Sequence, residues 1–228
     1  MLLQKEVAKE YTRFLRNRDY PCVAARAAAE KQTIKTFSAG NMACPTDDKA
    51  ILDFLYVFVD NYRISEGVFH SAAIIFEQPA LMDDEMFDKL MWQRLQSLAD
   101  LDAALYPFDK RVSNSVTSEN FSFSLKSEAF FILGLHPGSS RISRQFTYPA
   151  LVFNPHAAFD LLRSNGQYEK MKAIVRKREL HFSGSLNPML DDFGKTSEVY
   201  QYSGKEHPAD WQCPLQINHG KTTNNTAA

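Results

Sequence analysis

The chain has 228 residues, of which 44% are hydrophobic and 23% are charged, and its formal net charge is −1. This composition is that of an ordinary globular protein, and the length allows one large domain or two small ones. The near-zero charge excludes a global field that would attract nucleic acid or anionic lipid. No apolar h-region follows Met1, and no apolar run approaches the roughly 20 residues that cross a bilayer. We therefore expect a cytoplasmic protein with neither nucleic-acid nor membrane partners.

The spacing of apolar residues in the first half of the chain predicts helices interrupted by one strand. The first helix should end before Pro21, because the residue before a proline avoids the helical region. Acidic residues at the start of the longest helix complement its dipole, and apolar residues recur along it at spacings of three and four. The expected helices span residues 7–18, 24–31, 46–63 and 82–105, and the strand spans 72–76.

Three strand-like runs and two more helices follow. Phe121, Phe123 and Leu125 alternate with serines, so one face of the first run should be buried. Only a few residues separate it from the second run, which predicts an antiparallel hairpin. The expected strands span residues 121–125, 129–135 and 150–153, and the helices span 157–164 and 168–180.

These elements together predict an α+β fold with a largely antiparallel central sheet and helices packed around it. We find no internal repeat and no clear linker, so a single compact domain is expected over residues 1–215. Residues 216–228 are polar and nearly free of apolar side chains, which predicts a disordered tail.

The densest group of candidate functional residues lies at the end of the strand predicted over residues 129–135. His136 ends that strand, and the turn after it carries Ser139, Ser140, Arg141 and Arg144. Serine hydroxyls, turn amides and arginines together suit a carboxylate or a phosphate. The plainer alternative is a hydrogen-bonded turn with surface arginines.

A second histidine, His156, follows the next strand in the same way, and imidazole is the commonest protein ligand for metals. It can equally cap the following helix or lie in the core. The three cysteines, Cys22, Cys44 and Cys213, are too widely spaced for a disulfide framework and contain no CxxC pair. Cys22 and Cys213 are candidate thiolate donors, with small buried cysteines as the plainer interpretation.

Acidic residues in the glycine- and proline-rich segment after residue 181 are candidates for holding a cation. Asp191, Asp192 and Glu198 would suit a guanidinium through paired, charge-assisted hydrogen bonds, or would cap local turns. The sequence contains no GxGxxG, Walker A, HExxH or GxSxG motif. Nucleotide-driven chemistry and the common hydrolase designs are therefore disfavoured.

Four stretches of the chain read YPCVAARAA, FSFSLKSEAFFILGLHPGSSRISRQFTYPALVFNPHAAF, GSLNPMLDDFGKTSEVYQYSG and WQCPL. Together they span about Tyr20 to Leu215, and they resemble the YqcI/YcgG family. Two positions depart from the family pattern: Leu215 replaces a phenylalanine, and Phe108 stands where tryptophan is expected. A third, Ala157-Ala158, stands where a polar residue is usual, which implies a different substrate if position 158 faces it.

The family includes a haem-dependent N-hydroxylase of guanitoxin biosynthesis, so the resemblance implies haem b (iron protoporphyrin IX) and oxygenation of a guanidine or amine nitrogen. It implies His136 as the axial iron ligand, with Cys22, His156 and Cys213 as alternatives. Arg141 and Arg144, with Ser139 and Ser140, would bind the haem propionates. Asp191 and Glu198 would bind the substrate.

The implied partners are a small-molecule substrate and an electron donor or peroxide, and a homodimer is compatible with the sequence. Two other functions stay open: a non-catalytic haem carrier or a sensor of haem or gas, and a cofactor-free enzyme. In the latter, His136 would act as acid and base while Arg141 held an anion.

Overall fold

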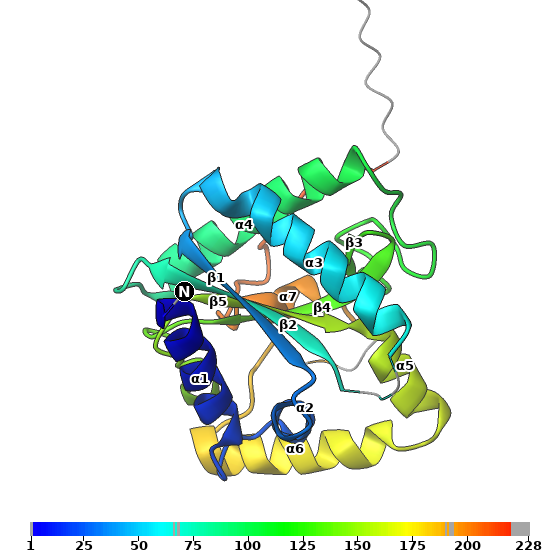
Figure 1. Cartoon of the computed structure of the whole chain (residues 1–228). Helices are drawn as coiled ribbons and strands as arrows, with labels where there is room; N and C mark the ends of the chain where they lie inside the picture. The colour runs from blue at the N-terminus through cyan, green and yellow to red at the C-terminus, as the bar shows by residue number, and fades with distance from the viewer. Residues whose placement is uncertain (1, 66, 68, 190, 192–193, 220–228) are drawn as a thin grey trace, which may run out of the picture.

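The computed structural model describes residues 2–65, 67, 69–189, 191 and 194–219, and it shows an α+β fold built on a five-stranded sheet (Figure 1). The strand order is β1-β2-β5-β4-β3. Three neighbouring pairs are antiparallel, as predicted, whereas β1 and β2 are parallel, so the sheet is mixed. The strands are β1 (Ile34–Asn41), β2 (Ser71–Gln78), β3 (Phe123–Leu125), β4 (Glu128–Leu135) and β5 (Ala150–Pro155).

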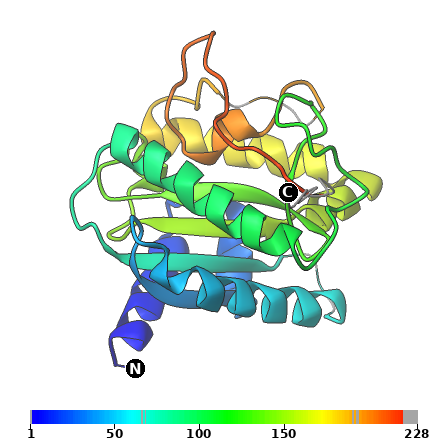
Figure 2. The same ribbon diagram turned by 90° about the horizontal axis from the view of Figure 1, so that it is seen from above.

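Helices cover both faces of this sheet. α3 (Asp48–Arg63) and α4 (Asp84–Ala103) lie on one face, and Figure 2 shows α4 lying across the strands. α1 (Leu2–Arg16), α2 (Val23–Glu30) and α6 (Tyr168–Ser183) lie on the other. α5 (His156–Ser164) follows β5 directly, and the short α7 (Val199–Tyr202) contacts β4. Two 3₁₀ helices complete the described part: Pro45–Asp47 and Ile142–Arg144.

Each central strand sends alternate side chains into two separate cores, because side chains alternate between the faces of a sheet. On β4, Ile132 packs with α3 and α4, whereas Leu133 and Leu135 face α1 and α2. On β5, Phe153 and Val152 divide in the same way. This alternation decides which residues reach the candidate site described below.

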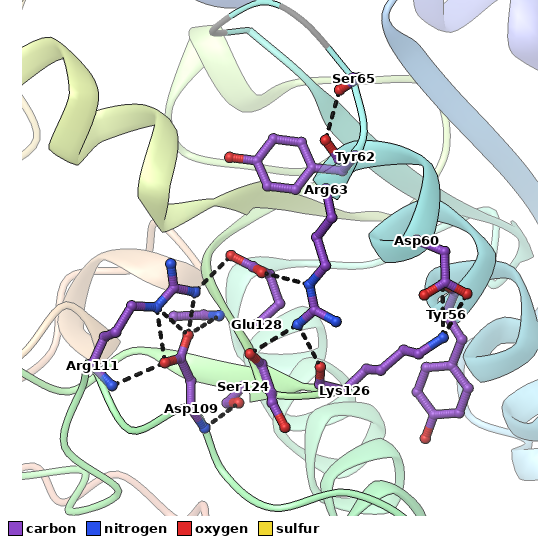
Figure 3. Close-up of polar contacts among 12 residues, drawn as sticks. Tyr56, Asp60, Tyr62, Arg63, Ser65, Asp109, Arg111, Ser124, Lys126 and Glu128 are labelled. Carbon is purple, nitrogen blue, oxygen red and sulfur yellow. Dashed lines mark hydrogen bonds and ion pairs between the residues drawn. The ribbon is translucent and has the colours of Figure 1, made fainter.

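The predicted hairpin of β3 and β4 is confirmed, although its two-residue turn has an unusual sequence. Lys126 and Ser127 adopt φ angles of 52° and 55°, a region that favours glycine or asparagine. Arg63 Nη2 donates to the carbonyl oxygens of both residues, at 2.9 and 3.1 Å (Figure 3). Glu128 accepts from Arg63 Nε at 3.3 Å and from Arg111 Nη2 at 2.8 Å. Arg63 thus ties α3 to a backbone conformation that the turn residues disfavour.

Two features differ from the sequence-based expectation. β1 was not predicted; it lies at the sheet edge with every residue but Ala39 half-exposed or exposed, so its apolar pattern is weak. The start of the predicted tail is ordered along α4: Gln216 N donates to Gln96 Oε1 at 2.8 Å, and His219 Nε2 lies 2.9 Å from Asp102 Oδ2. Residues 220–228 lie outside the described residues.

Candidate functional site

A cavity of about 350 Å³ lies between the sheet and the helices on the α1 side. Its volume falls in the range of small-molecule sites. Most of the surface of its wall is apolar, although nearly half of the described lining residues carry polar or charged side chains. The sheet contributes Leu133 and Val152, and the helices contribute Leu15, Ala28 and Met171. The cavity is therefore walled by segments that are far apart in the sequence.

His156 lines this cavity at the point where β5 ends and α5 begins. Its Nδ1 lies 3.5 Å from Asp160 Oδ2, and its Nε2 lies 3.9 Å from Glu198 Oε2. Burial is the main reason that the pKa of His156 is lowered, and neutral imidazole is the form that binds metals. His156 also lines a second cavity of about 160 Å³, together with Arg111 and Asp160.

Glu198 faces the same part of the cavity as a buried acid. Its Oε1 accepts hydrogen bonds from Ser122 Oγ at 2.8 Å and from the Tyr202 hydroxyl at 2.5 Å. Burial raises the pKa of Glu198 to about 8, although both hydrogen bonds oppose that change. Glu198 is therefore mainly protonated at neutral pH, and a bound cation would favour its ionised form.

The two arginines that were predicted to bind propionates line the cavity but are engaged with the protein itself. Arg144 donates to the carbonyl oxygens of Gln201 at 2.7 Å, Tyr202 at 2.8 Å and Gly134 at 3.3 Å, and burial lowers its pKa to about 10. Arg141 Nη2 donates to Glu179 Oε1 and to the Ser185 carbonyl, both at 2.8 Å. These contacts hold α7 and α6 in place.

The two predicted thiol donors differ in position. Cys22 lines the cavity and caps α2, where its Sγ accepts from Ala25 N at 3.4 Å. Burial raises the pKa of Cys22, so the thiol is the form expected at neutral pH. Cys213 packs against the core on the α3 and α4 side, where burial raises its pKa to about 12.

The structure places His136 away from the cavity. It is fully buried against Phe87, with ring centroids 4.4 Å apart, and its Nε2 lies 3.0 Å from Asp84 Oδ1. Two-residue periodicity continued from Ile132 puts His136 on the α4 face of the sheet, opposite the cavity. This position does not support its predicted role as axial ligand. Ser139 and Ser140 are likewise not among the described residues of the wall.

The predicted substrate residues are also brought into the wall: Asp191 lines the cavity together with Glu198, while Asp192 lies outside the described residues. Ala158, where the family pattern has a polar residue, lines the cavity as well.

The sequence interpretation missed a group of cavity residues on α5 and α6. Tyr168, Lys172 and Arg176 are four residues apart, so they share one face of α6, and Arg163 precedes them on α5. That helical spacing was the available signal, although it does not say what the face covers.

Among the described residues, no group of three or more His, Cys, Asp or Glu side chains is placed to hold a metal ion. This finding concerns metal ions that are held by protein side chains alone. It does not concern haem iron, which needs only one or two protein ligands. Nor does any helix in the described ranges combine the length and apolar character that a membrane span requires.

The fold and the site define a class: an α+β protein whose mixed sheet carries a largely apolar cavity with imidazole, thiol and cationic side chains in its wall. The chain belongs to the YqcI/YcgG family, whose model matches residues 11–216. It is 27% identical over 187 residues to the uncharacterized protein YqcI of Bacillus subtilis (strain 168), covering 79% of this chain and 72% of that protein. No solved structure matches the chain.

Proposed function

We propose that the protein is a haem-dependent N-oxygenase that acts on a small guanidine- or amine-containing substrate such as an arginine derivative. The observation that carries the proposal is the position of His156, a neutral imidazole in the wall of a largely apolar cavity. Membership of the YqcI/YcgG family supports the choice of cofactor.

The side chains present fit a haem. Apolar residues on the sheet, α1, α2 and α6 suit the porphyrin faces, and cationic residues of the wall suit its propionates. His156 has a carboxylate, Asp160, beside its Nδ1, which is the usual way to orient a metal-binding imidazole. We therefore propose that His156 would hold the haem iron, with Cys22 as the alternative donor in the same cavity.

When bound, the haem would supply the activation of oxygen or peroxide for transfer to nitrogen, and the reaction requires an electron donor or peroxide. The protein residues bind and orient the substrate. Asp191 lines the cavity and would attract a guanidinium, and Glu198 would pair with it once the bound cation favours its ionised form. Glu198 Oε1 accepts two hydrogen bonds, and its Oε2 lies 3.9 Å from His156 Nε2. Since Ala158 lines the cavity, we expect a substrate that differs from those of better-known members.

The test is the absorption spectrum of protein expressed with a haem precursor, repeated for His156→Ala and Cys22→Ala. The matched control is His136→Ala, which removes a buried histidine outside the cavity. We expect a Soret band whose shape changes in His156→Ala and persists in His136→Ala. If the band changes shape in Cys22→Ala and not in His156→Ala, the Cys22 sulfur is the iron ligand. Protein that stays colourless after haem addition would refute the proposal and favour a cofactor-free enzyme.

Turnover separates the oxygenase from a haem carrier or sensor. We expect N-hydroxy products from arginine-like compounds in the presence of a reductant or peroxide, and a Soret band without turnover would favour the carrier or sensor. The cysteines in the structure are all free, which fits the cytoplasmic location that we propose.

A further inference from the structure

Two cations lie beside one aromatic ring in the cavity wall. Arg163 Cζ is 5.2 Å from the centre of the Tyr168 ring, and Lys172 Nζ is 5.6 Å from the same centre. All three side chains line the cavity. At these distances a cation is attracted to the ring, so Tyr168 helps to hold both charges at one part of the wall. We call Arg163 and Lys172 the α5–α6 cation pair.

Each member of the pair has an acidic neighbour that lies largely in solvent. Arg163 Nη2 is 2.6 Å from Asp160 Oδ1, with the side chains 26% and 56% exposed respectively. Lys172 Nζ is 2.6 Å from Glu169 Oε2, with the side chains 18% and 74% exposed. Ion pairs with a solvated partner are worth little, whereas a charge inside a cavity interacts through a lower effective dielectric. A ligand carboxylate can therefore compete well for these cations.

The charges of the wall as a whole favour an anion. Among the lining residues that the structure describes, five are arginine or lysine, including Arg163 and Lys172, and three are aspartate or glutamate. Of those acids, Glu179 accepts from Arg141 and Ser143, both at 2.8 Å, and Glu198 is mainly protonated. The Arg144 guanidinium donates its hydrogen bonds to backbone carbonyl oxygens of the protein itself. Arg141 and Arg144, in the turn after β4, are therefore already engaged, and the cations of α5 and α6 are the ones that can bind a carboxylate.

We infer that Arg163 and Lys172 bind a carboxylate group of the ligand that occupies the cavity. The inference rests on the proposed function only for the source of that carboxylate, which is either a haem propionate or the acid group of the substrate. Both sources present a carboxylate to the α5–α6 cation pair. The two sources can be told apart with one pair of ligands for each, in which the two members differ only in the carboxylate.

The experiment measures two preference ratios. The first compares dissociation constants for hemin and hemin dimethyl ester by absorption titration. The second compares L-arginine with agmatine, which lacks the carboxylate, by calorimetry. Both ratios are measured for the wild type, Arg163→Gln, Lys172→Met and the rescue variant Lys172→Arg. The control is Lys170→Met, which removes an exposed lysine of the same helix that is not in the cavity wall.

We expect the wild type to prefer the carboxylate-bearing member of one pair. That preference should fall about tenfold or more in Arg163→Gln and Lys172→Met, as expected for one charge-assisted hydrogen bond, and persist in Lys172→Arg and Lys170→Met. A loss in the hemin pair identifies a propionate, and a loss in the arginine pair identifies the substrate. The inference is overturned if the wild type shows no preference in either pair, which includes the case in which no ligand binds. It is also overturned if the preference survives in both Arg163→Gln and Lys172→Met. Failure to bind hemin refutes only the proposed function, because the arginine pair still decides the inference.

Discussion

Glu198→Gln should remove a pH dependence of stability that the buried acid imposes. Glutamine retains an oxygen that accepts from Ser122 and Tyr202, and it does not titrate. In the folded protein the pKa of Glu198 is about 8, against an ordinary value of 4.5. The folded state therefore holds a proton that the unfolded state releases, so stability is present below pH 4.5 and is lost as the pH rises toward 8.

The size of the effect follows from these two pKa values. Between pH 5 and pH 8 the free energy of unfolding of the wild type should fall, relative to Glu198→Gln, by about 3 kcal/mol. Near pH 5 the two proteins should be similarly stable, and at pH 8 the variant should be the more stable.

The assay is urea unfolding of protein prepared without haem, at four pH values from 5 to 8, followed by tryptophan fluorescence. Trp92 is a suitable reporter because its ring lies 5.9 Å from the ring of Tyr202, the hydrogen-bond donor to Glu198. Glu206→Gln, at an exposed position, controls for the loss of one acid. If wild type and Glu198→Gln show parallel stability at every pH, Glu198 is ionised in the folded protein and the reasoning is wrong.

Three further predictions concern contacts that hold separate segments of the chain together. Arg144→Met should lower the free energy of unfolding by about 2–4 kcal/mol, since it leaves buried carbonyl oxygens without their donor; an unchanged urea midpoint would contradict this. Gly204→Ala should lower the free energy of unfolding by about 1–2 kcal/mol in the same assay, because Gly204 has a φ of 84° and an added Cβ would lie 2.6 Å from Arg144 Cδ. A variant as stable as the wild type would argue against this backbone constraint. A chain that ends after Leu215 should be about 2 kcal/mol less stable than one that ends after His219, because Asp102 loses a buried partner; equal melting temperatures would rule this out.

Local sequence patterns predicted most of the elements because their periods depend on backbone geometry alone. The apolar stripe of α4 is buried through Phe87, Met91 and Leu95, and the β3–β4 hairpin forms as expected. β1 escaped prediction because an exposed edge strand lacks a strong apolar pattern, and its parallel pairing with β2 is a long-range contact.

The candidate site was predicted only in part. Cys22, Arg141, Arg144, His156, Asp191 and Glu198 were named from the sequence, and all six line one cavity. His136 was expected at the site because it follows a strand, but the sequence does not tell whether a residue at a strand end faces the cavity or faces α4. Arg163 and Lys172 were overlooked because a charged helix face has the same sequence pattern whether it meets water or a ligand.

The amino-acid sequence by itself determined the α+β class, the family, and which residue types stand at the ends of the strands. Tertiary structure decided which of those residues meet, since the cavity forms only where α1, α2 and α6 cover one face of the sheet. The physical reason is that strand periodicity fixes the alternation of faces but leaves open which face is covered. His136 and His156 follow their strands in similar ways, yet only His156 is on the cavity side.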